Sequence, residues 1–284
     1  NAGSGIRFMN HPIIESSSMT QAWRDWLSSP AGAYLLDWEQ SQIDDVVVDI
    51  FGYHALQLGM PELEGLRANR MPHQWLASPD PDAASRSKPL DFAAHSVALP
   101  FQADSLDLLV MPHSLELSLD AHASLREAHR VLMPEGHLVI TGLNPTSLWG
   151  WRHKRSQWYQ KWGYQGLSAP PCDEMIAYWR LKDWLRLLGF EVKLSRFGCW
   201  RPAMDKAKWL QRWSWMDRLG AQWWPILGGA YVLVAVKKVH GGRIVGATWK
   251  KRRPQAKAAV GIAQRQPLPN EPNSLQRKNE CESR

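Results

Sequence analysis

Cysteine is scarce in this chain of 284 residues. The three cysteines, Cys172, Cys199 and Cys281, show none of the close spacings of a zinc site or a redox pair. We therefore expect no metal site, and the cysteine usage favours a reducing, cytoplasmic compartment.

Long apolar runs are also missing. No N-terminal stretch joins a positive start to an apolar run of about 7–15 residues, so the sequence does not predict a secretory signal. The longest apolar run, residues 223–236, contains Pro225 and two glycines and is too short to span a bilayer. No transmembrane segment is therefore expected.

Acidic residues are sparse in the second half of the chain. Residues 1–147 carry 8 Lys or Arg and 18 Asp or Glu, whereas residues 148–236 carry 14 and 6 and residues 237–284 carry 12 and 3. Residues 149–224 of this basic half contain 12 of the 17 tryptophans. This division indicates attraction to anionic partners, and it leaves both an anionic membrane and a nucleic acid open.

Apolar spacing predicts an alternation of helices and strands. Three-to-four spacing favours helices over residues 19–52, divided in two at Pro30 and Gly32. Strands that alternate with helices are typical of a parallel sheet. The predicted strands are 54–58, 74–77, 92–97, 106–111, 137–141, 190–194 and 230–236, and the later predicted helices are 121–132, 173–188 and 203–219.

A run of short motifs between residues 95 and 145 arrives in a characteristic order. The motifs are Leu99-Pro100-Phe101, Asp104-Ser105-Leu106-Asp107, His113-Ser114-Leu115-Glu116, Pro134-Glu135-Gly136 and Asn144-Pro145, followed downstream by Leu188-Gly189-Phe190. In this order they resemble the class I S-adenosylmethionine-dependent methyltransferase superfamily, in particular the group that includes the ubiquinone and menaquinone C-methyltransferases. The resemblance implies an α/β fold, a Rossmann-like seven-stranded methyltransferase sheet flanked by helices, here with Trp-rich insertions in the C-terminal half.

The resemblance also divides the chain. We expect a flexible N-terminal extension at residues 1–18 and a methyltransferase-like domain at residues 19–239, with a cofactor half at 19–147 and a substrate-side half at 148–239. Residues 240–284 have almost no apolar period and many charges, so they are predicted to be a disordered basic tail.

Open α/β sheets bind ligands beyond the carboxyl ends of their strands, where the strand order reverses. The resemblance therefore implies an S-adenosylmethionine site there, formed by residues that follow the first strands: Gln57, Gly59, Met60, Ser78, His95, Ser96, Met111 and His113.

The chain departs from the family pattern in its glycine loop and at three polar positions. Only Gly59 remains of three alternating glycines, and Pro61 fixes φ and lacks an N–H. Gln57 stands where the family has an acid. The ribose-binding acid falls near Ser78, with Asp80 two residues on, and His95 replaces the acid beside the adenine.

Each candidate residue has a structural alternative. Gly59 is equally a turn glycine, His113 and His95 are equally structural histidines, and Glu116 is expected to support the start of a helix. No catalytic residue is assigned. On the predicted helix 203–219, Trp209, Trp213 and Met216 share one face, which suits core packing, a lipid interface or an aromatic substrate.

These features predict a cytoplasmic methyltransferase that acts on a small, apolar or aromatic acceptor molecule. A second hypothesis is a methyltransferase-like binding or scaffold module that has lost catalysis, because the glycine loop is degenerate. A third is a nucleic-acid-associated protein that uses its basic half, including the run at residues 250–253.

Overall fold

The computed structural model describes residues 21–80, 89–161, 172, 175–204 and 206–238. These residues belong to one compact unit that ends at His240. The predicted extension at 1–18 and the predicted tail at 240–284 lie outside the described residues. Among the described helices, none combines the length and apolarity needed to cross a membrane.

Seven strands form one sheet with the order β3-β2-β1-β4-β5-β7-β6. The first five strands are parallel, and β7 runs antiparallel to both of its neighbours, β5 and β6. The strands are β1 (His54–Leu58), β2 (His73–Ser78), β3 (Phe92–Ala93), β4 (Leu106–Pro112), β5 (Leu132–Leu143), β6 (Phe190–Gly198) and β7 (Ala230–Lys237). This arrangement confirms the predicted Rossmann-like methyltransferase sheet.

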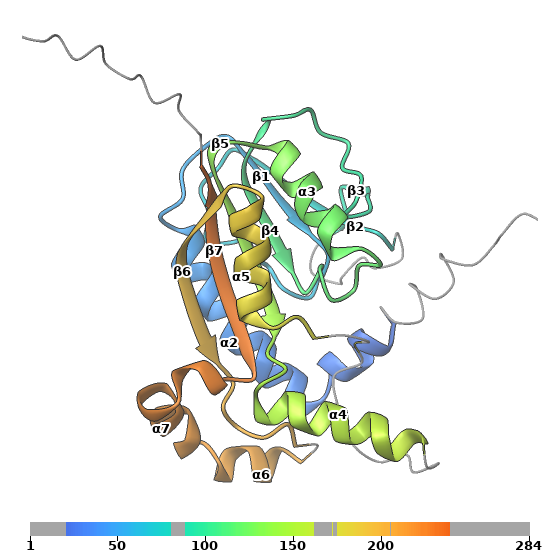
Figure 1. Ribbon diagram of the computed structural model, residues 1–284, viewed down its shortest axis with the longest axis vertical. Coiled ribbons are helices and arrows are strands. Elements are labelled where there is room, and N and C mark those ends of the chain that lie inside the picture. Colours follow the sequence, from blue (N-terminus) through green and yellow to red (C-terminus); the bar gives the residue numbers. More distant parts are fainter. Residues whose placement is uncertain (1–20, 81–88, 162–171, 173–174, 205, 239–284) are drawn as a thin grey trace, which may run out of the picture. The chain divides into compact units, whose positions relative to one another are not determined.

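Helices cover both faces of the sheet (Figure 1). The helix α2 (Pro30–Val47) packs on one face, and α3 (Ala121–Val131) and α5 (Tyr178–Leu187) pack on the other, so the sheet separates two apolar cores. The Ser29 side chain caps α2 by accepting the Gly32 N–H, and Pro30 occupies the first turn, where a missing N–H costs nothing. Pro30 therefore divides the predicted helical stretch by starting the second helix.

Gly32 brings that helix close to the preceding one. Residues 21–27 are helical, and a Cβ atom added at Gly32 would lie 2.4 Å from the Leu27 Cα. Only glycine allows this approach. The N-terminal helix is thereby held against the start of α2.

The clearest differences from the predicted elements are a shortened strand, a divided helix and one helix that was not predicted. The strand predicted at 92–97 ends after Ala93, and the helix predicted at 203–219 is two helices, α6 (Ala207–Arg212) and α7 (Trp215–Trp223), followed by the short 3-10 helix η2 (Pro225–Leu227). The break falls where Trp213 leaves helical geometry, beside Ser214, which has low helix propensity. The helix α4 (Leu148–Lys161) was not predicted, because Trp, Arg and Lys are spread around it without an apolar stripe.

Candidate cofactor and acceptor site

The strand order reverses between β1 and β4, so the turns after these strands meet at one edge of the sheet. After β1, Gly59 has a φ of 81° and Met60 a φ of 43°, and the Gly59 N–H donates to the Ala77 carbonyl at 2.7 Å. A Cβ atom on Gly59 would lie 3.1 Å from the Ser114 Oγ. A glycine therefore suits position 59, because the backbone there has a positive φ and a side chain would lie close to Ser114.

Gln57 holds the loop after β1 from inside. Its buried side-chain amide donates to the carbonyl oxygens of Met60 at 3.0 Å and Leu63 at 2.6 Å, and its Oε1 accepts the Gly65 N–H at 2.8 Å. An acid at this position could not donate to those carbonyls. In the structure Gln57 therefore braces the loop.

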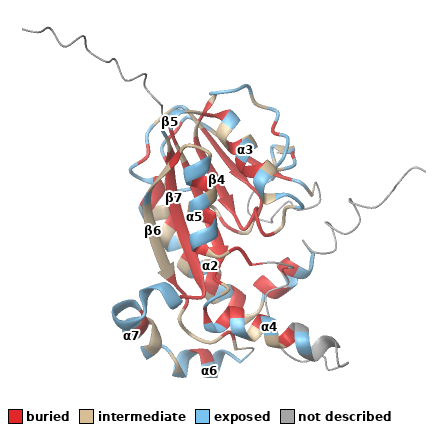
Figure 2. Cartoon of the chain, viewed as in Figure 1, coloured by how far each residue is buried: buried red, intermediate tan, exposed pale blue. Residues whose placement is uncertain are grey.

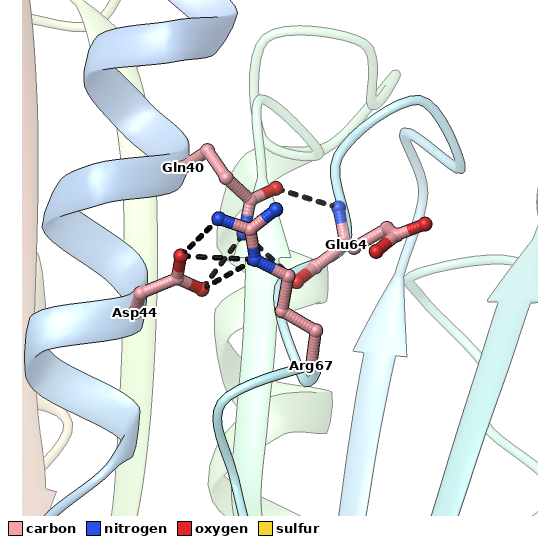
Figure 3. Close-up of polar contacts among 4 residues, drawn as sticks. All are labelled: Gln40, Asp44, Glu64 and Arg67. Atoms are coloured by element: carbon pink, nitrogen blue, oxygen red, sulfur yellow. Dashed lines mark hydrogen bonds and ion pairs between the residues drawn. The ribbon is translucent and has the colours of Figure 1, made fainter.

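The same loop is clamped to α2 from outside, as Figure 3 shows. Gln40 accepts the Glu64 N–H at 2.9 Å and donates to the Glu64 carbonyl at 3.0 Å, while Arg67 pairs with Asp44. The described residues between β1 and β2 contain turns and no helix. Side-chain contacts with α2 therefore hold this connection in position, as a packed helix would otherwise do.

Acidic side chains lie in the loops after β1 and β2, and Arg24 lies within ion-pair distance of both. Ser78 is buried at the end of β2, and its Oγ accepts the Asp80 N–H at 3.3 Å. Arg24, in the N-terminal helix, lies 2.8 Å from an Asp80 carboxylate oxygen and 3.5 Å from one of Glu62. The charge of Arg24 thus holds the N-terminal helix against the loops that follow β1 and β2.

A buried ion network follows β4. His113 Nε2 lies 2.8 Å from Glu39 Oε1, and His113 Nδ1 lies 2.7 Å from Glu116 Oε2. The other oxygen of Glu116 accepts the Leu143 N–H at 2.7 Å. All three side chains are almost completely buried. His113 therefore connects α2, the turn after β4 and the end of β5.

The two carboxylates determine the protonation of His113. Burial alone would lower its pKa, but the charges and hydrogen bonds of Glu39 and Glu116 outweigh burial and raise the pKa to about 10. Burial raises the pKa of Glu116. At neutral pH His113 is a cation that donates from both ring nitrogens, so it is not a free base.

Several buried polar atoms near this network have no hydrogen-bond partner. Glu39 Oε2, Thr141 Oγ1 and the indole nitrogens of Trp23 and Trp26 are buried without a hydrogen-bond partner. Native interiors pair nearly all such groups, so these atoms are available to an ordered water or to a ligand.

Aromatic rings extend from this network. The Trp23 ring lies 5.0 Å from that of His113, Trp26 lies 5.5 Å from Trp23, and Trp149 lies 5.9 Å from Trp26. Tyr34 follows at 6.5 Å from Trp149. We call Trp23, Trp26, Trp149 and Tyr34 the aromatic row.

The remaining predicted site residues lie in different surroundings. Met111 is buried in the core on the α3 side of the sheet. Ser96 lies 2.8 Å from Ser124 through their hydroxyls, near the start of α3, and His95 is exposed. The structure thus brings Gly59, Met60, Ser78 and His113 to the carboxyl edge, with Gln57 beneath them.

The expectation that Glu116 supports the start of a helix is wrong. The helix α3 begins at Ala121, capped by Asp120, whose side chain accepts the Ala123 N–H at 2.9 Å. Glu116 instead binds His113. Sequence reasoning also missed Glu39, although Leu35, Glu39 and Ile43 share one face of α2 and an acid within an apolar stripe is a signal of a buried ion pair.

Comparisons with known proteins agree with this architecture. A profile of the family described as "Methyltransferase domain" matches residues 77–140. The uncharacterized protein YafS of Escherichia coli strain K12 is 30% identical over 174 residues, which cover 61% of this chain and 67% of that protein.

Two solved structures share the fold at 15% identity. One is an S-adenosylmethionine-dependent methyltransferase of Thermotoga maritima, with a TM-score of 0.50 over 80% of this chain and 96% of that chain. The other comes from the complex of the Haloferax volcanii Trm112 methyltransferase activator with a methyltransferase, with a TM-score of 0.52 over 78% and 98%. The chain belongs to the class I, Rossmann-like methyltransferase superfamily, which implies S-adenosylmethionine as its cofactor.

The residues at the carboxyl edge suit that cofactor. The Gly59 turn has the positive φ that a glycine in a cofactor loop supplies, while its own N–H is hydrogen-bonded to the Ala77 carbonyl and its side-chain position faces Ser114. The carboxylates of Glu62 and Asp80 can accept hydroxyl or ammonium hydrogens. Arg24 lies beside both of these acids, and a bound cofactor would share them with its guanidinium.

Proposed function

We propose that this methyltransferase acts on a small acceptor molecule that is apolar or aromatic and binds beside the aromatic row. The observation that carries this proposal is the juxtaposition of the Gly59 turn with a buried His113 network, against which the Trp23 ring packs and beside which several buried polar atoms have no hydrogen-bond partner. Such a lining, mostly apolar with a few placed polar groups, is characteristic of small-molecule sites.

Methyl transfer depends mainly on alignment. S-adenosylmethionine supplies an electrophilic methyl group on a sulfonium, and the acceptor attacks it in line. The protein contributes by holding the acceptor at the right distance and angle and by excluding water. The aromatic row serves both needs, because its rings are rigid and exclude water.

Glu39 is the group that we assign to proton transfer. His113 holds Glu39 Oε1, while Glu39 Oε2 remains available to accept a proton from an acceptor O–H or N–H. His113 then acts as a positioning residue, because its raised pKa keeps its own proton in place. General-base catalysis of this kind contributes about 10²–10⁴-fold.

A catalytically inactive binding module is the second candidate. The braced Gln57 loop and the Arg24 ion pairs favour it, because both stabilise a closed edge. This candidate predicts ligand binding without turnover.

Two further assignments stay predictions. The cytoplasmic location rests on the cysteine usage, and Cys172 and Cys199 are buried. The boundaries at residues 18 and 239 rest on the sequence pattern. Within them, Gly59 and Glu39 come from the acidic half, while Trp149 comes from the basic half.

The test of the proposed function is a turnover assay. Purified protein is incubated with S-adenosylmethionine and a panel of phenols, quinols and aromatic amines, and S-adenosylhomocysteine is quantified. We expect at least one acceptor to give turnover and Glu39→Gln to reduce kcat by about 10²-fold or more with little change in cofactor affinity. The matched control is Glu64→Gln, a loop acid whose backbone, not its carboxylate, contacts Gln40. Cofactor binding without turnover across the panel would favour the inactive module.

A further inference from the structure

Seven large apolar side chains are exposed together at the end of the molecule that carries α6 and α7. They lie between 42% and 69% exposed, and Figure 2 shows these helices mainly in the colour of exposed residues. We call this set the Trp platform: Trp209, Trp215, Leu219, Trp223, Trp224, Ile226 and Leu227. A cluster of this kind marks an interaction surface, because isolated exposed apolar residues are ordinary but contiguous ones are not.

The platform is built rigidly, so its exposure is a property of the fold. Asp217 receives hydrogen bonds from Tyr34 at 2.5 Å and Arg201 at 2.8 Å, and these bonds tie α7 to the domain. Asn144, directly after β5, donates to the carbonyls of Ile226 and Gly228. A Cβ atom at Gly220 would lie 2.3 Å from the Trp200 ring, so α7 packs closely there. The inward side of the platform is therefore fixed while its tryptophans face outward.

Positive charge surrounds these tryptophans. Lys206, Lys208, Arg212 and Arg218 are exposed, and the Arg212 guanidinium lies 5.6 Å from the centre of the Trp209 ring. Asp217 is the one acid among the described residues of this segment. It forms an ion pair with Arg201 and accepts a hydrogen bond from Tyr34. The exposed charges of the described platform are thus all basic.

We propose that the Trp platform docks on an anionic lipid bilayer. Indole rings prefer the interface between water and hydrocarbon, and basic side chains beside them meet anionic headgroups. The charge argues against two other occupants. A second copy would bring the same positive surface, and residues 237–284, with 12 basic and 3 acidic residues, are repelled by it.

The platform lies near the expected acceptor site, so docking would serve the reaction. This step rests on the proposed function. The platform's anchor Asn144 follows β5, and its anchor Tyr34 is the last member of the aromatic row. The row leads from there to Trp23 and His113. Docking therefore brings the membrane surface to the end of the sheet where an apolar acceptor is expected.

Vesicle co-sedimentation of the full chain tests this proposal without any cofactor. The probes are vesicles of phosphatidylcholine alone and of phosphatidylcholine mixed with phosphatidylglycerol. We expect binding to the mixed vesicles that weakens as salt rises, since the screening length falls to about 8 Å at about 0.15 M. The triple variant Trp215→Ser, Trp223→Ser, Trp224→Ser should lose at least about tenfold in affinity, and Lys206→Gln with Lys208→Gln and Arg212→Gln should lose about as much.

The matched control is Trp179→Ser. Trp179 lies on α5, outside the platform, and at 59% it is as exposed as Trp224. It should bind vesicles like the unmodified chain. Quenching of wild-type tryptophan fluorescence by lipids brominated along the acyl chain provides a readout that needs no variant, and we expect quenching in the mixed vesicles.

Several results would overturn the proposal. These are unchanged binding by the triple variant, equal binding to both vesicle types, absence of quenching, or loss of binding only when residues 250–253 are changed to glutamine. A dimer in sedimentation equilibrium that the triple variant abolishes would assign the platform to self-association instead. Because no cofactor is present, failure here leaves the turnover assay to judge the proposed function separately.

Discussion

His113→Ala is expected to lower the free energy of unfolding by about 3–5 kcal/mol. The histidine is fully buried and balances the carboxylates of Glu39 and Glu116, so its removal leaves buried negative charge without compensation. Chemical denaturation followed by circular dichroism measures the loss. The matched control is His95→Ala, an exposed histidine, which should stay within about 0.5 kcal/mol.

A second substitution separates two effects on stability, that of the unpaired charge and that of the lost side-chain volume. Adding Glu39→Gln to His113→Ala removes one of the stranded charges, so the double variant should be more stable than His113→Ala alone. If His113→Ala costs less than about 1 kcal/mol, or the double variant is the less stable, the buried ion network does not stabilise the fold in the way described.

Stability should fall as pH rises above neutrality. The folded pKa of His113 is raised to about 10, above an unfolded value of about 6.5, so its contribution is complete below about 6.5 and is lost as pH rises through 10. Between about pH 7 and 8.5 the slope should approach 1.4 kcal/mol per pH unit, in the direction of lower stability.

Two other histidines act on the acid side of the pH axis. Burial lowers the pKa of His129 and of His137, so their contributions are lost on the acid side, as pH falls. Burial raises the pKa of the Cys199 thiol, which adds to the loss at higher pH. Denaturation curves of the unmodified chain and of Cys199→Ala should therefore share the slope between pH 7 and 8.5. A flat profile there in both would contradict a cationic, ion-paired His113.

The sheet could be predicted from the sequence because its signals are local. The strands β4 and β5 are buried on both faces and carry apolar residues such as Leu108 and Val139, and Gly189 marks a turn. The helix α4 gave no such signal, because its polar and apolar residues do not separate into faces. The break between α6 and α7 was missed because it depends on Trp213 and Ser214 alone.

The site was less predictable, because its contacts join distant parts of the chain. Glu39 lies 74 residues before His113, and Arg24 lies 56 residues before Asp80. The motifs located the turn after β4 but gave no means of pairing His113 with α2. Gln57 was correctly placed at the glycine loop, yet its bonds to Met60, Leu63 and Gly65 depend on a loop shape that its neighbours in sequence do not specify.

The central claim is that the Gly59 turn at the strand reversal binds S-adenosylmethionine, and a calorimetric titration tests it most directly. Gly59→Val adds a branched side chain where φ is 81° and the nearest side-chain atom would be 3.1 Å from its Cβ. Gly189→Val is the matched control, because that glycine has a φ of 89° but precedes β6, away from the turn. We expect the unmodified chain and Gly189→Val, where folded, to bind S-adenosylmethionine and S-adenosylhomocysteine, and Gly59→Val to lose at least about tenfold in affinity, or about 1.4 kcal/mol. Absence of heat and of any melting shift for the unmodified chain, at ligand concentrations up to about the millimolar range, would contradict the account.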